Sequence, residues 1–167
     1  MIDTGMVGCC WLSVDDPQPA PSTSTCTLEY SCDYQQLKIS LDSDIAPLRI
    51  LSFDIECAGR KGIFPDPQVD PVIQIANIVT VQGQSSPMIS NIFTLNTCAH
   101  IAGSVVNECK TEQELLMGWS DFVREVDPDI IIGYNINGFD FPYLLDRAQK
   151  LNLNKFPYLG RLKGTLL

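Results

Sequence analysis

The chain has 167 residues, and 45% of them are hydrophobic, which is enough to bury a core. Its net charge of −9 argues against simple binding to a phosphate backbone, which requires a basic surface. No stretch approaches the roughly 18 to 20 apolar residues of a membrane span, so we expect no membrane partner.

The first 48 residues differ in composition from the rest of the chain. They carry seven acids and one base, whereas residues 49–167 carry thirteen acids and ten bases. Residues 7–14 could form one strand, and residues 15–25, rich in Pro, Ser and Thr, are expected to be a loop or disordered. We therefore predict a partial N-terminal domain segment with a linker over 1–48, and a second partial domain over 49–167.

From Leu48 onward the pattern becomes regular and predicts an α/β domain. Two apolar strands joined by a Gly/Pro loop lead, through a turn at 83–87, into a third strand. Thr111 and Glu114 form a capping box ahead of an apolar helical stripe, and a fourth strand and a second helix follow. The predicted strands are 48–57, 72–81, 88–95 and 130–134, and the predicted helices are 111–127 and 141–151.

Two carboxylates interrupt the first of these strands. Asp54 and Glu56 alternate with Phe53, Ile55 and Cys57, so both acids point to the same face of the strand. Two unpaired carboxylates in a low-dielectric sheet are costly, and a divalent cation with oxygen ligands is a common compensation. A buried hydrogen-bond network around Asp54 is the alternative, and Cys57 fits a small buried side chain better than a nucleophile.

A third carboxylate, Asp140, follows the apolar run of residues 130–132. Sites in open α/β sheets form outside the carboxyl ends of the strands, where Asp140 and the end of the Asp54 strand could meet. Three such acids suggest a two-metal phosphodiester hydrolase. Asp140 ahead of Pro142 is also typical of a helix N-cap, and Asn135 and Phe139 could be turn and core residues.

These segments resemble two motifs of a known family. Phe53-Asp54-Ile55-Glu56 resembles the Exo I motif of the 3′→5′ proofreading exonuclease of family B DNA polymerases, and Asn135 to Phe139-Asp140 resembles Exo II. The resemblance is weakest over residues 13–44. It implies a ribonuclease-H-like mixed sheet, built from a three-strand meander, a helix, a strand and a helix, and incomplete at its C-terminal end. Longer runs that share the resemblance are residues 1–11, 53–64, 70–75 and 139–144.

The resemblance also implies roles for individual residues. Asp54 would bridge two Mg²⁺ or Mn²⁺ ions, while Glu56 would join one ion and Asp140 the other. Asn135 and Phe139 match positions that contact the single-stranded 3′ end of a DNA primer, with the phenylalanine packing on a nucleotide. The implied protein is a nuclear, DNA-directed DNA polymerase with 3′→5′ exonuclease activity that works with accessory subunits and a sliding clamp.

One family motif is absent from the sequence. Exo III carries a Tyr-x-x-x-Asp pair downstream of Exo II, and the last third of this chain holds none. We therefore expect a fragment that degrades single-stranded DNA barely or not at all, with marginal stability or self-association. The alternative is an exonuclease-like fold that serves as a non-catalytic scaffold or interaction module. Metal binding distinguishes the exonuclease fragment from the non-catalytic scaffold.

The last residues of the chain are basic. Five bases and no acids occur from Arg147 onward, and they could face a phosphate backbone or form an ordinary solvated surface. These bases are Arg147, Lys150, Lys155, Arg161 and Lys163.

The seven cysteines lack Cys-x-x-Cys spacing, and His100 is the only histidine. This pattern argues against a zinc site or a disulfide framework. We expect reduced thiols, as in the nucleus or cytosol.

Overall fold

A computed structural model describes residues 5–166, so residues 1–4 of the family-like N-terminal run lie outside the described residues. The chain separates into two units. One contains the chain up to Ala46 together with Arg161–Lys163, and the other contains Pro47–Gly160 with the residues from Gly164 onward. The candidate site lies in the second unit.

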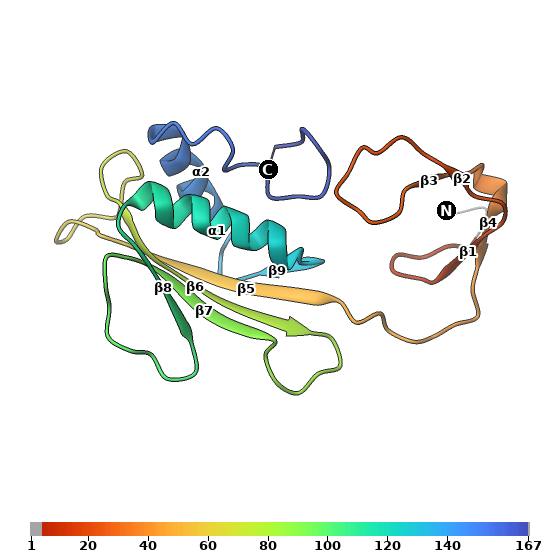
Figure 1. The fold of residues 1–167 in the computed structure, drawn as a ribbon, viewed down its shortest axis with the longest axis horizontal. Coiled ribbons are helices and arrows are strands. Elements are labelled where there is room, and N and C mark those ends of the chain that lie inside the picture. Colours follow the sequence, from red (N-terminus) through yellow and green to blue (C-terminus); the bar gives the residue numbers. More distant parts are fainter. Residues whose placement is uncertain (1–4, 167) are drawn as a thin grey trace. The chain divides into compact units, whose positions relative to one another are not determined.

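A five-stranded sheet in the order β8-β7-β6-β5-β9 organises the second unit. The three central strands form an antiparallel meander, while β9 runs parallel to β5 and β8 runs parallel to β7 (Figure 1). The strands are β5 (Arg49–Cys57), β6 (Val72–Val81), β7 (Ile89–Leu95), β8 (Val105–Cys109) and β9 (Ile130–Ile132).

Helix α1 (Glu112–Val126) begins where the sequence predicts. The Thr111 hydroxyl accepts the Glu114 backbone N–H at 3.1 Å, and Asp127 ends the helix in the left-handed conformation. The second half of the capping box differs from expectation, because the Glu114 carboxylate accepts the N–H of Lys110 at 2.7 Å. Helix α2 (Asp140–Lys150) begins one residue earlier than predicted.

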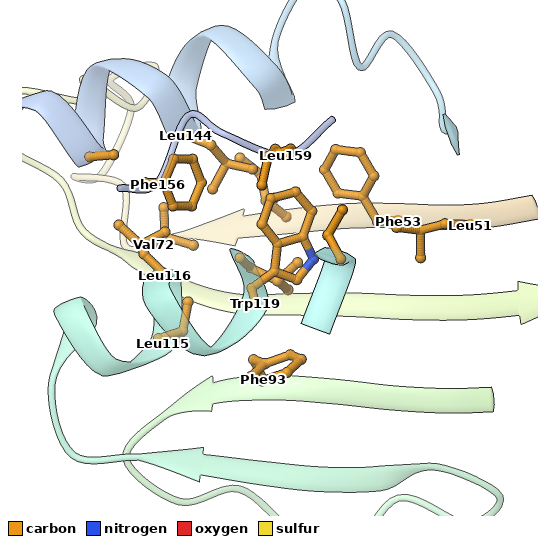
Figure 2. Packing of buried hydrophobic residues seen from close by; sticks show 14 of the residues in the cluster. Leu51, Phe53, Val72, Phe93, Leu115, Leu116, Trp119, Leu144, Phe156 and Leu159 are labelled. Atoms are coloured by element: carbon orange, nitrogen blue, oxygen red, sulfur yellow. The ribbon is translucent and has the colours of Figure 1, made fainter. Parts of the chain in front are cut away.

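Both helices cover one face of the sheet and bury a single core against it (Figures 1 and 2). Trp119 of α1 is completely buried at the centre of this core. Its ring stacks on Phe156 and makes a tilted contact with Phe53, with centroid distances of 5.9 and 5.0 Å. Its indole N–H donates to the buried Asn77 side chain of β6 at 2.8 Å. The polar group of the largest core residue is therefore satisfied inside the core.

The first unit contains short paired strands. Strand β1 (Leu12–Val14) pairs with β4 (Leu37–Ile39), and β2 (Gln18–Pro19) pairs with β3 (Tyr30–Ser31) ahead of a 3₁₀ turn at Tyr34–Gln36. The strand expected over 7–14 thus covers only its last three residues. The expectation of loop or disorder over 15–25 is wrong at Gln18–Pro19, because Tyr30–Ser31 supplies a pairing partner from outside that segment.

The predicted order of three meandering strands, helix, strand and helix is confirmed. Strand β8 was not predicted, and it extends the sheet beyond β7. Strand β9 stops at Ile132, two residues earlier than predicted. Within the part of the chain that the structure describes, no helix has the length and apolar character needed to cross a membrane.

Candidate metal and nucleic-acid site

Asp54 and Glu56 lie on the face of β5 that the helices leave open. Their side chains are exposed. Phe53, which precedes Asp54, and Ile55, which lies between the two acids, are 3% and 5% exposed and belong to the core. The alternation of a half-buried strand accounts for this arrangement. Ala76 of β6 lies opposite Asp54, so the neighbouring strand adds only a methyl group beside this carboxylate.

The pairing of β5 with β6 becomes irregular directly after the second acid. Glu56 pairs with Gln74, but Cys57 pairs with Val72, so β6 has one extra residue at this point. Such irregularities bend a strand and redirect its side chains. Burial raises the pKa of the Cys57 thiol to about 11, so the thiol stays protonated at neutral pH, as expected for a structural cysteine.

Asp140 approaches β5 from the first residue of α2. Its carboxylate is 1% exposed, and its Oδ1 accepts the backbone N–H of Ile55 at 3.2 Å. Strand β9 pairs with β5 only as far as Ser52, so the carboxylate takes the place of a strand partner beyond that point. The helix-cap alternative is wrong, because Phe139 holds the N-cap position and makes no side-chain cap.

Asp54 and Asp140 act directly on each other. Burial raises the pKa of Asp140 above its usual range, and Asp54 raises it further as a negative charge and as a hydrogen-bond partner. Backbone N–H groups, including that of Ile55, oppose this shift. The structure therefore brings together two carboxyl groups from β5 and α2, one of which is buried.

This pair fits a hard divalent cation. Carboxylate oxygens are the donors that Mg²⁺ and Mn²⁺ prefer, and a bound cation would offset both the burial of the Asp140 charge and its repulsion by Asp54. Among residues 5–166, no group of three or more His, Cys, Asp or Glu side chains is gathered closely enough to hold a metal ion. Glu56 thus shares the strand face with Asp54 but lies outside a three-ligand cluster.

Asn135 lies in the tight turn between β9 and α2. Its backbone has a φ of +54°, and its carbonyl accepts the N–H groups of Gly138 and Phe139 at 2.9 and 3.0 Å. Its side chain lies against Gly138, where an added Cβ would be only 2.4 Å from the Asn135 Oδ1. Asn135 is exposed, so its side chain is accessible to a ligand. It also fits the alternative of a turn residue, because asparagine tolerates the left-handed conformation of this turn.

Phe139 is half-buried and packs between two other aromatic rings. Its centroid is 5.4 Å from that of Phe64, in the loop after β5, and 5.4 Å from that of Tyr143. Phe64 is 75% exposed, whereas Tyr143 is 3% exposed. The ring of Phe139 thus joins the core on one side and an exposed aromatic on the other.

The expectation that Arg147 belongs to a basic, phosphate-facing surface is wrong. Its guanidinium is buried against Glu112 at the start of α1, with Nε–Oε1 and Nη2–Oε2 distances of 2.7 Å. Sequence reasoning missed this pair. The available signal was the position of Arg147 on the buried face of α2, seven residues after Asp140 and beside the buried Ala148.

A groove of about 480 Å³ extends from Asp54 across the open face of the sheet. Ser52 and Ala76 form part of its floor, and Tyr134, which is 94% exposed, lines one side. A second groove, of about 500 Å³, lies between α1 and the outer strands β7 and β8, and neither Asp54 nor Asp140 lines it.

The chain is similar to known proteins along its whole length. A family model described as DNA polymerase family B, exonuclease domain, matches residues 1–166. The chain is 52% identical to the DNA polymerase delta catalytic subunit of Glycine max and 50% identical to that of Candida albicans, with 99% and 98% of this chain covered. It spans 16% of the length of each of these relatives.

A solved structure shares the fold. The family B DNA polymerase of the hyperthermophilic archaeon Pyrobaculum calidifontis matches with a TM-score of 0.62 and 32% sequence identity. The match covers 97% of this chain and 18% of that one.

Proposed function

The chain belongs to the exonuclease domain family of family B DNA polymerases, and from this premise we propose that it carries a 3′→5′ proofreading exonuclease site. The contact between the buried Asp140 and Asp54 is the observation that supports this proposal most directly. We assign the site to residues 49–167 and propose that residues 1–48 belong to a preceding domain segment. The full activity, a DNA-directed DNA polymerase with proofreading, is proposed for the larger protein that the delta catalytic subunits represent.

The proposed site divides its work among five residues. Asp54, Glu56 and Asp140 would hold two Mg²⁺ or Mn²⁺ ions, which supply an activated water and stabilise the leaving oxygen of a phosphodiester. Asn135 and Phe139 would bind the single-stranded 3′ end of a DNA primer. A phenylalanine ring stacks on any base, which suits an exonuclease without sequence preference.

The proposed partners and compartment follow from the similarity to delta catalytic subunits. We propose that the larger protein works in the nucleus with polymerase accessory subunits and a sliding clamp. The reduced cysteines are compatible with this compartment, because all seven are free.

Direct measurement of Mn²⁺ binding tests the proposed site. We expect the wild-type chain to bind Mn²⁺, and Asp54→Ala and Asp140→Ala each to weaken the affinity by at least about ten-fold. Titration followed by Mn²⁺ paramagnetic resonance measures the affinity without any need for turnover.

Asp146→Ala is the matched control, because Asp146 is an exposed acid on the same helix as Asp140. It should leave Mn²⁺ affinity unchanged. If all four proteins bind Mn²⁺ equally well, or none binds it, the two-metal proposal is wrong and the non-catalytic scaffold becomes the better description of this fold.

A further inference from the structure

Helix α2 carries three polar residues along its buried face. Asp140, Tyr143 and Arg147 lie at positions i, i+3 and i+7, and they are 1%, 3% and 8% exposed. Asp140 reaches β5, Tyr143 reaches the loop between β5 and β6, and Arg147 reaches that loop and the start of α1. Since polar groups are buried only when they are well paired, the partners of this row determine where the helix lies.

Arg147 ties α2 to the start of α1 and to the loop that joins β5 to β6. Besides its two bonds to Glu112, its Nη1 donates to the carbonyl of Pro67 at 3.0 Å. The Glu112 carboxylate also accepts the backbone N–H of Val72, the first residue of β6, at 2.8 Å. One buried ion pair therefore joins four segments of the chain.

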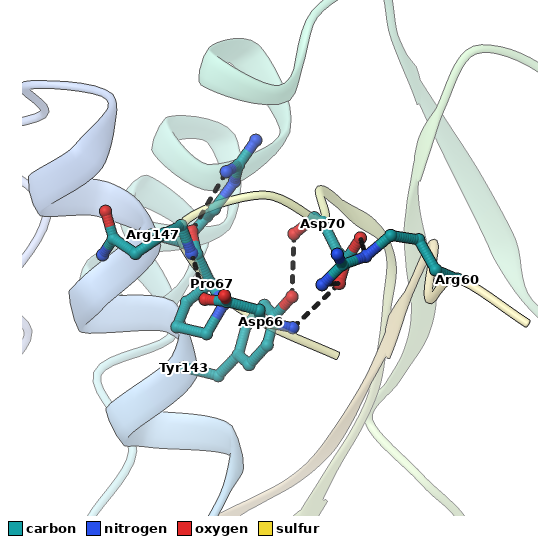
Figure 3. A network of polar contacts seen from close by, with 7 residues as sticks. Arg60, Asp66, Pro67, Asp70, Tyr143 and Arg147 are labelled. Carbon is teal, nitrogen blue, oxygen red and sulfur yellow. Dashed lines mark hydrogen bonds and ion pairs between the residues drawn. The ribbon is translucent and has the colours of Figure 1, made fainter. Parts of the chain in front are cut away.

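Tyr143 makes a second connection to the same loop, closer to the carboxylates. Its hydroxyl donates to the Asp70 carbonyl at 2.7 Å. The Asp70 carboxylate in turn accepts the N–H of Asp66 at 2.9 Å and the Nε of Arg60 at 3.1 Å (Figure 3). The loop between β5 and β6 is thus stabilised by hydrogen bonds among its own residues, and it is bonded to α2 at two points.

We propose that Tyr143 and Arg147 are positioning residues that hold the first turn of α2 against β5, and so set the contact between Asp140 and Asp54. The two contacts to the loop lie one and two turns after Asp140 on the same helix face. Without them, the polar links described between this turn and β5 are those that Asp140 itself makes, to the Ile55 N–H and to Asp54. The metal-binding consequence rests on the proposed function, whereas the structural consequence does not.

A metal site needs its ligands to be held in position by other residues. Metal ligands must be held within about 0.5 Å of their productive positions, and losing an outer partner of a ligand typically weakens metal binding 10- to 100-fold. Tyr143 and Arg147 would act on metal binding through the position of Asp140, and neither would itself be a metal ligand.

Tyr143→Phe removes one hydroxyl and keeps the ring in the core. We expect the Ile55 amide hydrogen to exchange about three to ten times faster, because the carboxylate that protects it is held less firmly. Mn²⁺ affinity should fall about ten-fold. Arg147→Lys keeps the charge but loses the planar fork, and it should change both readouts in the same direction. Should Tyr143→Phe fail to fold, Arg147→Lys carries the same test.

Ser120→Ala is the matched control, because the Ser120 hydroxyl is also buried and bonds a backbone carbonyl, that of Phe156 at 3.3 Å, away from the carboxylates. It should lower the melting temperature by a similar amount without changing Ile55 exchange or Mn²⁺ affinity. The positioning role is wrong if both α2 variants keep wild-type Ile55 exchange, or if Ser120→Ala accelerates it equally. If Asp140→Ala itself leaves Mn²⁺ affinity unchanged, the proposed function fails, and Ile55 exchange alone then decides the positioning role.

Discussion

Asp140 shows how a single residue can oppose the stability of the fold that holds it. Its raised pKa means that the folded chain binds a proton at this carboxyl more tightly than the unfolded chain does. Ionisation of Asp140 therefore weakens the fold. The protonated Asp140 carboxyl contributes fully to stability below the usual pKa of an aspartate. This contribution is lost as the pH rises from that value through the raised pKa of the folded chain.

Asp140→Asn should stabilise the metal-free chain at neutral pH. Asparagine keeps an oxygen for the Ile55 N–H and can donate to Asp54, but it carries no buried charge. We expect a melting temperature a few degrees above wild type at pH 7 in a chelating buffer, and no difference at pH 3. Asp146→Asn, on the exposed side of α2, should match wild type at both values. A destabilised Asp140→Asn at pH 7 would contradict the unfavourable charge.

At the scale of elements, the junction between β9 and α2 depends on one glycine. A Cβ at Gly133 would lie 2.3 Å from Cγ2 of Ile136 and 2.7 Å from the Phe53 carbonyl oxygen. The close approach to β5 explains why β9 ends at Ile132 and why the chain can turn towards Asp140 within a few residues. The glycine is required for space, because the positive φ in this turn belongs to Asn135.

Gly133→Ala should therefore lower the free energy of unfolding by about 1–3 kcal/mol, the usual cost of forcing an extra group into a packed site. Gly160→Ala is the matched control, since nothing lies within 4 Å of its added Cβ, and its effect should stay within about 0.5 kcal/mol. Urea unfolding of both variants measures the difference. Equal stabilities would mean that the turn can move away from β5 at little cost.

The elements that the sequence predicts well are those whose signals are local. Strand β6 has its predicted bounds, and α1 follows its cap at Thr111, because alternation and capping depend on neighbouring residues. Strand β8 was missed because its five residues show no strict alternation, and its parallel partner β7 determines its conformation. The same limit applies to single residues. Alternation along β5 correctly placed Asp54 and Glu56 on one face, but Arg147, whose environment depends on a distant partner, was assigned to the surface. Its partner Glu112 is 35 residues away.

At the scale of the whole molecule, the two units are stabilised in different ways. Every buried hydrophobic residue of the described chain lies between Leu51 and Leu159 in the second unit. In the described part of the first unit, Ser24 is the only buried residue. Burial of apolar surface is the main source of stability, so the first unit should open at a much lower free energy than the second.

Glu29 is the residue on which the first unit most visibly depends. Its carboxylate accepts the backbone N–H groups of Thr23 and Ser24 at 2.8 and 3.0 Å, and both hydroxyls at 2.9 Å. These bonds, those from the backbone foremost, lower its pKa to about 2. Because the folded pKa is depressed, the stabilisation is complete above the ordinary value near 4.5 and is lost as the pH falls through about 2.

Glu29→Gln should make the first unit insensitive to acid in this range and less protected at neutral pH. In wild type, we expect the protection of the Thr23 and Ser24 amides against hydrogen exchange to fall between pH 4.5 and 2, while the Trp119 region stays protected. The variant should show low protection at Thr23 and Ser24 throughout, with unchanged melting of the second unit. Asp16→Asn removes an exposed acid from the same unit and should behave as wild type. If Glu29→Gln instead lowered the melting temperature of the second unit, the two units would not be energetically independent, and the stability of the carboxylate site would depend on the N-terminal residues as well.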